Sequence, residues 1–223
     1  MISNGMNLSK RSKFSENLIS WHRTNKASFP WREEKDPYKI LVSEILLRKT
    51  TRKQVKEIFP RFFQKYPNFS VLVDAPLVEI DKTIRPLGME HKRAQLLKEL
   101  AGRIVSEHGG VVPTTEKDLL ELPGVGKYAA NAVLCFAGSK DVPLVDTNAI
   151  RVIQRVFSFK AKKKRARTDP EVWEFVSSLI PPGNGRVFNL AILDFAAAVC
   201  MPRNPKCSSC PNNAICDYYS KLR

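Results

Sequence analysis

Apolar residues recur at intervals of three and four along almost the whole chain of 223 residues, the spacing that places side chains on one face of an α-helix. The first such face comprises Leu41, Ile45 and Leu46, on a helix expected to begin near Pro37. The period continues through Val55, Ile58, Phe59 and Phe62, through Leu96, Leu97, Leu100 and Ile104, and through Leu119, Leu120, Ala129, Val133 and Leu134. Turn-forming residues separate these stretches, and no long alternating strand pattern is present. We therefore expect an all-α fold of about ten short helices.

The chain is strongly basic, with 37 Lys and Arg residues against 22 Asp and Glu residues and a formal net charge of +15. A field of that sign attracts polyanions. Charge alone separates neither DNA from RNA nor either from an anionic membrane, and a basic protein that binds no polyanion is the alternative. The run KAKKKRAR at residues 160–167 is expected in an exposed loop or helix end, either solvated or in contact with phosphate.

No apolar run reaches the roughly 18 residues that a membrane span needs. The N-terminal sequence MISNGMNLSKRSKFSENLISW lacks the apolar block and small-residue cleavage site of a secretory signal. We therefore expect a cytoplasmic, nucleoid-associated protein with no membrane partner.

Four of the five cysteines lie near the C-terminus, at Cys200, Cys207, Cys210 and Cys216, with the spacing C-x6-C-x2-C-x5-C. Disulfides are rare in cytosolic proteins, and C-x2-C is a common metal-chelating unit. Four thiolates hold either a [4Fe–4S] cluster or a zinc ion, and the spacing leaves both open. Cys135 lies in an apolar helical stretch, where a buried small apolar residue is expected.

Residues 116–136, EKDLLELPGVGKYAANAVLCF, predict two helices joined by a tight turn. The first helix is expected to run to Leu122 and the second to restart at Lys127, with Gly124, Val125 and Gly126 between them. Glycine N–H groups can approach a phosphate closely, and the dipole of the second helix favours an anion there. This pattern is typical of a helix–hairpin–helix that contacts the DNA backbone without reading its sequence. A plain tight turn is the alternative.

Two acidic residues are candidate catalysts. Asp146, in VDTNAIRV, either caps the helix that follows it or faces DNA as a catalyst, since an acid that only met phosphates would be repelled. Glu44, in ILVSEILLRKTT, interrupts an apolar helix face, where an unpaired acid is costly. A surface glutamate is the alternative for Glu44.

These motifs together resemble the endonuclease III superfamily of helix–hairpin–helix DNA glycosylases. LPGVGKYAA, VDTNAIRV and the cysteine array occur in that order, and the likeness runs from about Phe29 to Cys216. FPWR at residues 29–32 and SEILLRKTT at residues 43–51 resemble the branch with the mismatch adenine and mismatch thymine glycosylases. The archaeal-type, mismatch-specific thymine glycosylases are the most similar group within it.

The resemblance implies two helical domains with DNA in a cleft between them. A six-helix barrel with the helix–hairpin–helix would span residues 30–139. A discontinuous helical domain would combine residues 1–29 with 140–223 and carry the cluster loop at residues 200–216. By resemblance alone, the four cysteines are expected to hold a [4Fe–4S] cluster rather than zinc.

The resemblance also implies how the base is removed. Bifunctional members carry a lysine where this chain has Tyr128, and a phenol cannot form a Schiff base, so removal without strand cleavage is expected. Tyrosine resembles the thymine branch, whereas the adenine branch has a small hydroxyl residue and an additional C-terminal domain. Seven residues follow Cys216, so we expect that domain to be absent. Thymine or uracil opposite guanine is the expected target.

Individual roles follow from the same resemblance. Asp146 would stabilise the positive charge on the sugar or orient the attacking water. Glu44 would hydrogen-bond the flipped base or a water, and Tyr128 would line the pocket.

Other residues would contact the DNA. Arg48 aligns with a glutamine that fills the gap left by the flipped base, and Lys49 follows it. Met89 aligns with an apolar wedge, with a core methionine as the alternative. Lys127 and the glycine turn would hold a phosphate.

We expect a monomer that binds double-stranded DNA with a mismatched or damaged base. The first alternative is an adenine or oxidised-pyrimidine glycosylase on the same scaffold. The second is a non-catalytic DNA-binding protein that senses damage, and the third is a zinc-bound nucleic-acid scaffold.

Overall fold

The computed structural model describes residues 4–222, and every regular element in that range is a helix. The all-α prediction is confirmed. The expected number of about ten helices was too low: this range holds thirteen α-helices and three 3-10 helices. Several are only one or two turns long, which leaves too few positions for an apolar period to repeat. None of the helices in residues 4–222 combines the length and the apolar content of a membrane span.

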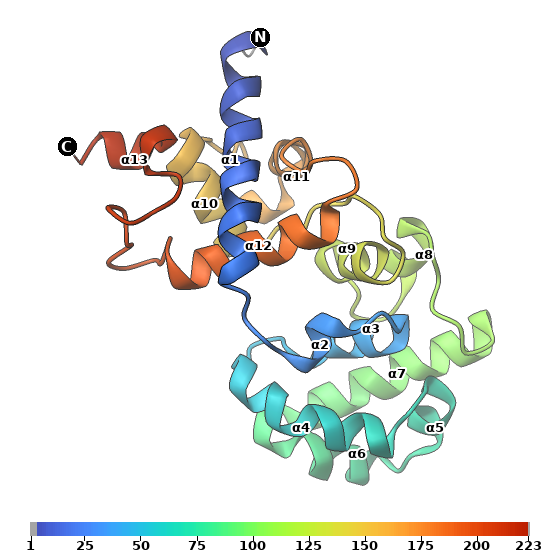
Figure 1. Cartoon of the computed structure of the whole chain (residues 1–223). Helices are drawn as coiled ribbons and strands as arrows, with labels where there is room; N and C mark the ends of the chain where they lie inside the picture. Colours follow the sequence, from blue (N-terminus) through green and yellow to red (C-terminus); the bar gives the residue numbers. More distant parts are fainter. Residues whose placement is uncertain (1–3, 223) are drawn as a thin grey trace. The chain divides into compact units, whose positions relative to one another are not determined.

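Internal contacts group the chain into two compact units, which are described separately below (Figure 1). The first unit is Ser28–Gly138. It contains α2 (Pro30–Glu33), α3 (Pro37–Leu46), α4 (Arg52–Lys65), α5 (Phe69–Asp74), α6 (Leu77–Ile84), the 3-10 helix Arg85–Leu87, α7 (Glu90–His108), α8 (Glu116–Glu121) and α9 (Lys127–Phe136). The second unit joins Met1–Ala27 to Ser139–Arg223. It contains α1 (Asn4–Thr24), α10 (Thr147–Phe157), the 3-10 helix Ala166–Thr168, α11 (Pro170–Ser177), α12 (Gly185–Ala198), the 3-10 helix Asn213–Ile215 and α13 (Asp217–Ser220).

Helix α3 is central to the 28–138 unit and packs against α4, α7 and α9. Asp36 starts the helix by accepting a hydrogen bond from Tyr38 N at 2.9 Å. Pro37 follows at the first helical position, as predicted, where its missing N–H is no loss. Seven of the ten residues of α3 are buried, so neighbours cover most of its circumference rather than a single stripe.

The expected apolar faces are buried with two exceptions. Leu96 is partly exposed, and Leu120 is 43% exposed, whereas their neighbours Leu97 and Leu119 are fully buried. Successive residues lie about 100° apart around a helix, so the residue next to a buried one tends to point outward. The prediction for Cys135 is confirmed, since its side chain is buried.

Helix α1 packs along α12, so segments from the two ends of the chain share one core. Phe14 of α1 is fully buried. Its ring meets Phe157 of α10 edge to face at 5.3 Å between centroids and Phe188 of α12 at 6.5 Å. His22 of α1 also lies 3.1 Å from the Asp194 carboxylate of α12, with both side chains buried. The chain must therefore return after residue 138 to complete the core that α1 begins.

The basic run at residues 160–167 forms an exposed loop between α10 and α11, as expected. The buried Asp169 organises it: its carboxylate accepts hydrogen bonds from Lys162 N at 2.6 Å and Lys163 N at 3.1 Å. The same carboxylate caps α11 by accepting from Glu171 N at 3.1 Å. One buried acid thus holds a loop of exposed cations in a folded conformation.

We predict that Asp169→Asn lowers the melting temperature at neutral pH, because an amide is a weaker acceptor for three backbone N–H groups than a carboxylate. These hydrogen bonds, that from Lys163 N first, lower the pKa of Asp169 below its ordinary value of 3.8. The stabilisation is therefore present above pH 3.8 and is lost as the pH falls through the lowered pKa. Thermal unfolding at a series of pH values should show the two proteins converging in acid. Asp74→Asn, at an exposed position, is the control, and a pH-independent difference would contradict the prediction.

Candidate active site and nucleic-acid interface

Helices α8 and α9 form the predicted hairpin, joined by residues 122–126. The first helix ends one residue earlier than expected, and Leu122 caps it through a hydrogen bond from its N–H to Leu119 O. Gly124 has φ +70°, and a Cβ atom there would lie 2.7 Å from Leu96 Cδ1. The positive φ therefore favours glycine, and any larger residue would also have to displace the Leu96 side chain.

Of the three residues that follow Gly124, the first is buried and the other two are exposed. Val125 is 7% exposed, and its N–H donates to Leu122 O at 3.0 Å, so it anchors the turn internally. Gly126 is exposed and precedes α9. Lys127 Nζ lies 3.7 Å from the Glu116 carboxylate across the hairpin. The exposed backbone at the two glycines is thus the part of the turn that a phosphate can reach.

The segment after α3 lies against this hairpin. The Arg48 guanidinium donates a hydrogen bond to Gly124 O. Burial lowers the pKa of Arg48, and the negative charge of Glu44 partly offsets that effect. Lys49 follows as an exposed residue with φ 51°. The structure therefore brings Glu44, Arg48 and the hairpin turn together within the 28–138 unit.

Glu44 and Tyr128 both belong to this unit and are both half-buried. Glu44 lies on α3, where its charge acts on Arg48, so it is not an isolated surface glutamate. Tyr128 is the second residue of α9, directly after the hairpin.

Met89 is not a core residue, so that alternative is wrong. Its side chain is 51% exposed, and it adopts a left-handed conformation with φ 54° after Gly88 with φ +69°. Residues 88 and 89 therefore both have positive φ, and the half-exposed Met89 lies immediately before α7. An exposed, flexible apolar side chain on a shaped loop is suited to insertion between bases.

Asp146 belongs to the other unit, and it caps α10. Its Oδ1 accepts hydrogen bonds from Asn148 N at 2.9 Å and Ala149 N at 2.8 Å, and its Oδ2 accepts from Asn148 Nδ2 at 2.7 Å. The capping interpretation is therefore confirmed. The carboxylate remains half-buried rather than enclosed, so capping and catalysis are compatible and the cap fixes its orientation.

Two residues that sequence reasoning missed support Asp146. Asn148 Oδ1 accepts from Arg151 Nη1 at 3.1 Å, and Arg151 in turn donates to Cys200 O at 2.9 Å and Ala196 O at 3.0 Å. This chain of contacts connects the Asp146 carboxylate to the start of the cysteine loop. The only sequence signal was the spacing of Asn148 and Arg151, which places them one turn apart on the same helix face.

The cysteine loop lies between α12 and α13, and polar hydrogens point at its sulfurs. Arg155 Nη1 lies 3.5 Å from Cys200 Sγ, and Asn212 N donates to Cys210 Sγ at 3.4 Å. Burial, opposed by the Asn212 N–H and reinforced by the charges of the other three sulfurs, raises the pKa of Cys210 to about 11. In residues 4–222, however, no three Cys, His, Asp or Glu side chains are arranged to hold a single metal ion.

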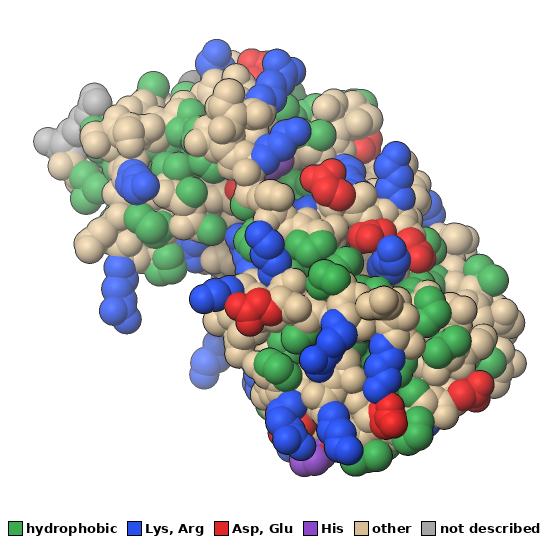
Figure 2. Space-filling model, turned by 60° about the horizontal axis from the view of Figure 1, so that its bottom comes forward, with side chains coloured by type: hydrophobic (Ala, Val, Ile, Leu, Met, Phe, Trp, Pro, Cys, Tyr) green, Lys and Arg blue, Asp and Glu red, His purple; other side chains and the backbone are tan. Residues whose placement is uncertain are grey.

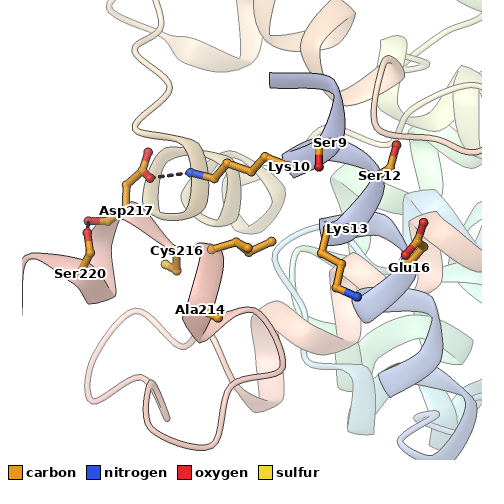
Figure 3. A pocket seen from close by; sticks show the side chains of 10 residues that line it. Ser9, Lys10, Ser12, Lys13, Glu16, Ala214, Cys216, Asp217 and Ser220 are labelled. Atoms are coloured by element: carbon orange, nitrogen blue, oxygen red, sulfur yellow. Dashed lines mark hydrogen bonds and ion pairs between the residues drawn. The ribbon is translucent and has the colours of Figure 1, made fainter. Parts of the chain in front are cut away.

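Helix α1 contacts the cysteine loop and α13 through hydrogen bonds and an ion pair. Asn17 Nδ2 donates to Pro211 O at 3.1 Å and to Asn212 Oδ1 at 3.2 Å. Lys10 pairs with Asp217 of α13 at 2.5 Å (Figure 3). A pocket of about 660 Å³ lies between α1 and the C-terminal segment, with Cys216 in its lining.

Lys and Arg side chains are spread over the face drawn in Figure 2. Combined with the net charge of +15, this surface suits a polyanionic partner.

Comparisons with known proteins decide the family. Residues 42–178 match the model of the HhH-GPD superfamily base excision DNA repair proteins. The chain belongs to the HhH-GPD superfamily. It is 47% identical to a thymine/uracil-DNA glycosylase of Pyrobaculum aerophilum, over 94% of this chain and 93% of that protein. It is 42% identical to a thymine/uracil-DNA glycosylase of Methanothermobacter thermautotrophicus, over 95% and 96% of the two chains.

A solved structure supports the fold of this HhH-GPD protein. The structure of a thermostable thymine-DNA glycosylase matches with a TM-score of 0.90 and 41% identity, covering 96% of this chain and 98% of that one.

We predict that Gly124→Ala weakens DNA binding at least tenfold and lowers stability by about 1–3 kcal/mol, because a side chain there is strained at positive φ and overlaps Leu96. Gly102→Ala, on α7, is the matched control, since a Cβ atom there has only an ordinary contact at 3.8 Å with Val73 Cγ2. Fluorescence anisotropy with a labelled duplex and thermal unfolding measure the two effects. Equal behaviour of the two variants would contradict the assigned role of Gly124.

Proposed function

We propose that the protein is a DNA glycosylase of base excision repair that hydrolyses the N-glycosidic bond of thymine or uracil mispaired with guanine. The observation that carries this proposal is the Asp146 carboxylate, held in one orientation by three hydrogen bonds at the start of α10. The similarity to thymine/uracil-DNA glycosylases over nearly the whole chain supports the choice of substrate. The substrate partner would be double-stranded DNA, bound by a monomer.

The first step is extrusion of the mispaired nucleotide, because its glycosidic bond is inaccessible inside the stack. The hairpin turn at Gly124 and Gly126 would hold a backbone phosphate and set the register. Arg48 would fill the gap left by the base, with Lys49 beside it on the backbone, and Met89 would wedge into the opposite strand. Mispairing lowers the cost of this step, which favours mismatched over paired bases.

The second step is bond cleavage. The bond between sugar C1′ and the base nitrogen breaks, its electron pair leaves with the base, and positive charge develops on the sugar. The Asp146 carboxylate would stabilise that charge and orient the water that attacks C1′, as carboxylates do in glycoside hydrolysis. Glu44 would hydrogen-bond the departing base or a water. The water keeps one hydrogen as the new hydroxyl on C1′ and releases one proton, and the departing base takes up a proton from solvent or from that water.

Tyr128 would line the pocket for the extruded base. Without an amine at this position the sugar cannot be captured as a Schiff base. The reaction would therefore end at an abasic site, without β-elimination.

The four cysteines at residues 200–216 are proposed to hold a [4Fe–4S] cluster. The chemistry of the donor set supports this proposal, since four thiols lie within residues 200–216 and the Asn212 and Arg155 N–H groups point at sulfur, as is common around iron–sulfur ligands. Binding would require the four sulfurs to converge, because the described residues do not hold them around one point. When bound, the cluster would supply a structural cross-link for the loop. Cys200, Cys207, Cys210 and Cys216 would be its ligands.

A duplex nicking assay tests the proposed function. Labelled duplexes with T·G, U·G, A·G or A opposite 8-oxoguanine are incubated with the protein and split into samples with and without alkali. We expect cleavage of T·G and U·G after alkali only. Cleavage without alkali would contradict the role of Tyr128, and activity restricted to adenine would move the substrate to the sister branch.

We predict that Asp146→Asn abolishes base removal, by at least 1,000-fold, while the protein folds and binds DNA normally. Asparagine ranks beside aspartate as a helix cap, and its Oδ1 can keep the two backbone hydrogen bonds at the start of α10. The variant therefore removes the charge and the one side-chain hydrogen bond from Asn148. Single-turnover rates and anisotropy on the T·G duplex measure the two properties. Retained activity would exclude Asp146 as the catalytic carboxylate.

We predict that the purified protein is yellow-brown, with broad absorption near ~400 nm and about four irons per chain, as a [4Fe–4S] cluster requires. Cys210→Ser should lower the iron content, whereas Cys135→Ser, in the buried α9 position, should not. Colourless protein with one bound zinc would contradict the assignment.

A further inference from the structure

Arg93 of α7 is a buried cation in the 28–138 unit, with 6% of its surface exposed. Its guanidinium donates to four backbone carbonyl oxygens rather than to an acid. Nη1 donates to Ile45 O and, at 3.3 Å, to Leu46 O. Nη2 donates to Arg48 O at 3.0 Å and lies 3.5 Å from Gly88 O. No ion pair of Arg93 with an acid occurs in the described part of the chain.

These carbonyls belong to two separate loops. Ile45 and Leu46 are the last residues of α3, where helical carbonyls lack partners within the helix, and Arg48 lies in the segment that follows. Gly88 is the residue before Met89, and the Arg93 N–H also donates to Met89 O at 3.0 Å. One side chain and its own backbone N–H therefore connect the Arg48 loop to the Met89 loop.

Burying the charged guanidinium of an arginine in this space costs free energy of desolvation. Burial and the nearby positive charge of Arg48 lower the pKa of Arg93, so its environment opposes the charge. An apolar residue of similar length would avoid that penalty. An apolar residue would, however, lack the planar set of N–H donors with which arginine binds several carbonyl groups at once.

We propose that Arg93 is a positioning residue for base extrusion, which sets the spacing between the segment that fills the gap, at Arg48 and Lys49, and the wedge at Met89. This inference rests on the proposed function, because it assigns both segments to the DNA duplex. Both must enter the duplex together, and looseness in either loop adds an ordering cost to that step. Arg93 itself makes no bond to the hairpin, which is linked to the Arg48 segment by the hydrogen bond from the Arg48 guanidinium to Gly124 O. We therefore expect the phosphate contact of the hairpin to depend less on Arg93 than the two loops do.

Two variants and a control test the proposal. Arg93→Met removes the donors and keeps an unbranched side chain, and Arg93→Lys keeps the charge but offers one nitrogen instead of a fork. Arg103→Met is the control, because Arg103 is an exposed residue of the same helix whose ion pair among the described residues is with Glu107, at 2.7 Å. Thermal unfolding establishes that each variant is folded.

Two readouts separate positioning from general stability. Hydrogen exchange at residues 47–51 and 86–91 should accelerate in both Arg93 variants and not in Arg103→Met. Extrusion, followed by 2-aminopurine fluorescence beside a T·G mismatch, and the single-turnover rate should both fall about 10–100-fold. Affinity for a matched duplex should change less than threefold. Arg93→Lys should recover at most part of either loss.

The possible outcomes distinguish failure of this proposal from failure of the proposed function. Unchanged exchange and extrusion in a folded Arg93 variant would overturn the proposal, as would equal losses of extrusion and of matched-duplex affinity. If wild-type protein removes no base from any duplex, the proposed function fails. The exchange data then still decide whether Arg93 couples the two loops.

Discussion

The 28–138 unit depends on hydrogen-bond partners for the backbone groups at the two ends of α3. The helix is buried on most sides, so its terminal N–H and C=O groups cannot rely on water. Asp36 closes the N-terminal end, and Arg93 closes the C-terminal end from α7. The chain beyond Leu46 then turns outward with Arg48 against Gly124. The same contacts that satisfy a buried helix therefore define where the cationic loop lies relative to the hairpin.

In the other unit, Asp146 caps a helix and is also the proposed catalyst. A carboxylate at a helix N-terminus is stabilised by the N–H groups and the dipole of that helix, and here Asn148 adds a side-chain hydrogen bond. Such a carboxylate is held rigidly, which is what a group facing a developing positive charge needs. Arg151 extends this support to the backbone of Cys200. A cluster bound in the cysteine loop would thus stabilise the same segment that supports Asp146.

Local signals carried most of the sequence-based prediction. The apolar period predicted the helices, Pro37 predicted the start of α3, and the glycines predicted the hairpin turn. Each of these structures depends on residues that are close together in the sequence. Leu120 was misjudged since a six-residue helix gives its apolar pattern little weight. Arg93 and Arg151 were missed because their partners lie far away in sequence, up to 49 positions for Arg151 and Cys200. Asn148 was missed although its partners Asp146 and Arg151 are only two and three positions away. Met89 could be read either as wedge or as core until its exposure was known. The roles assigned to the site residues and the domain boundaries at 30–139 stay predictions.

The most direct test of the central claim is to identify the product released from a T·G duplex by mass spectrometry, with wild-type protein and Asp146→Asn side by side. If the Asp146 carboxylate drives glycosidic hydrolysis, wild-type protein releases free thymine and leaves an intact strand with an abasic site. The variant then binds the duplex equally well and releases none. Thymine release by the variant at a comparable rate, or no free base from the wild-type protein, would contradict it.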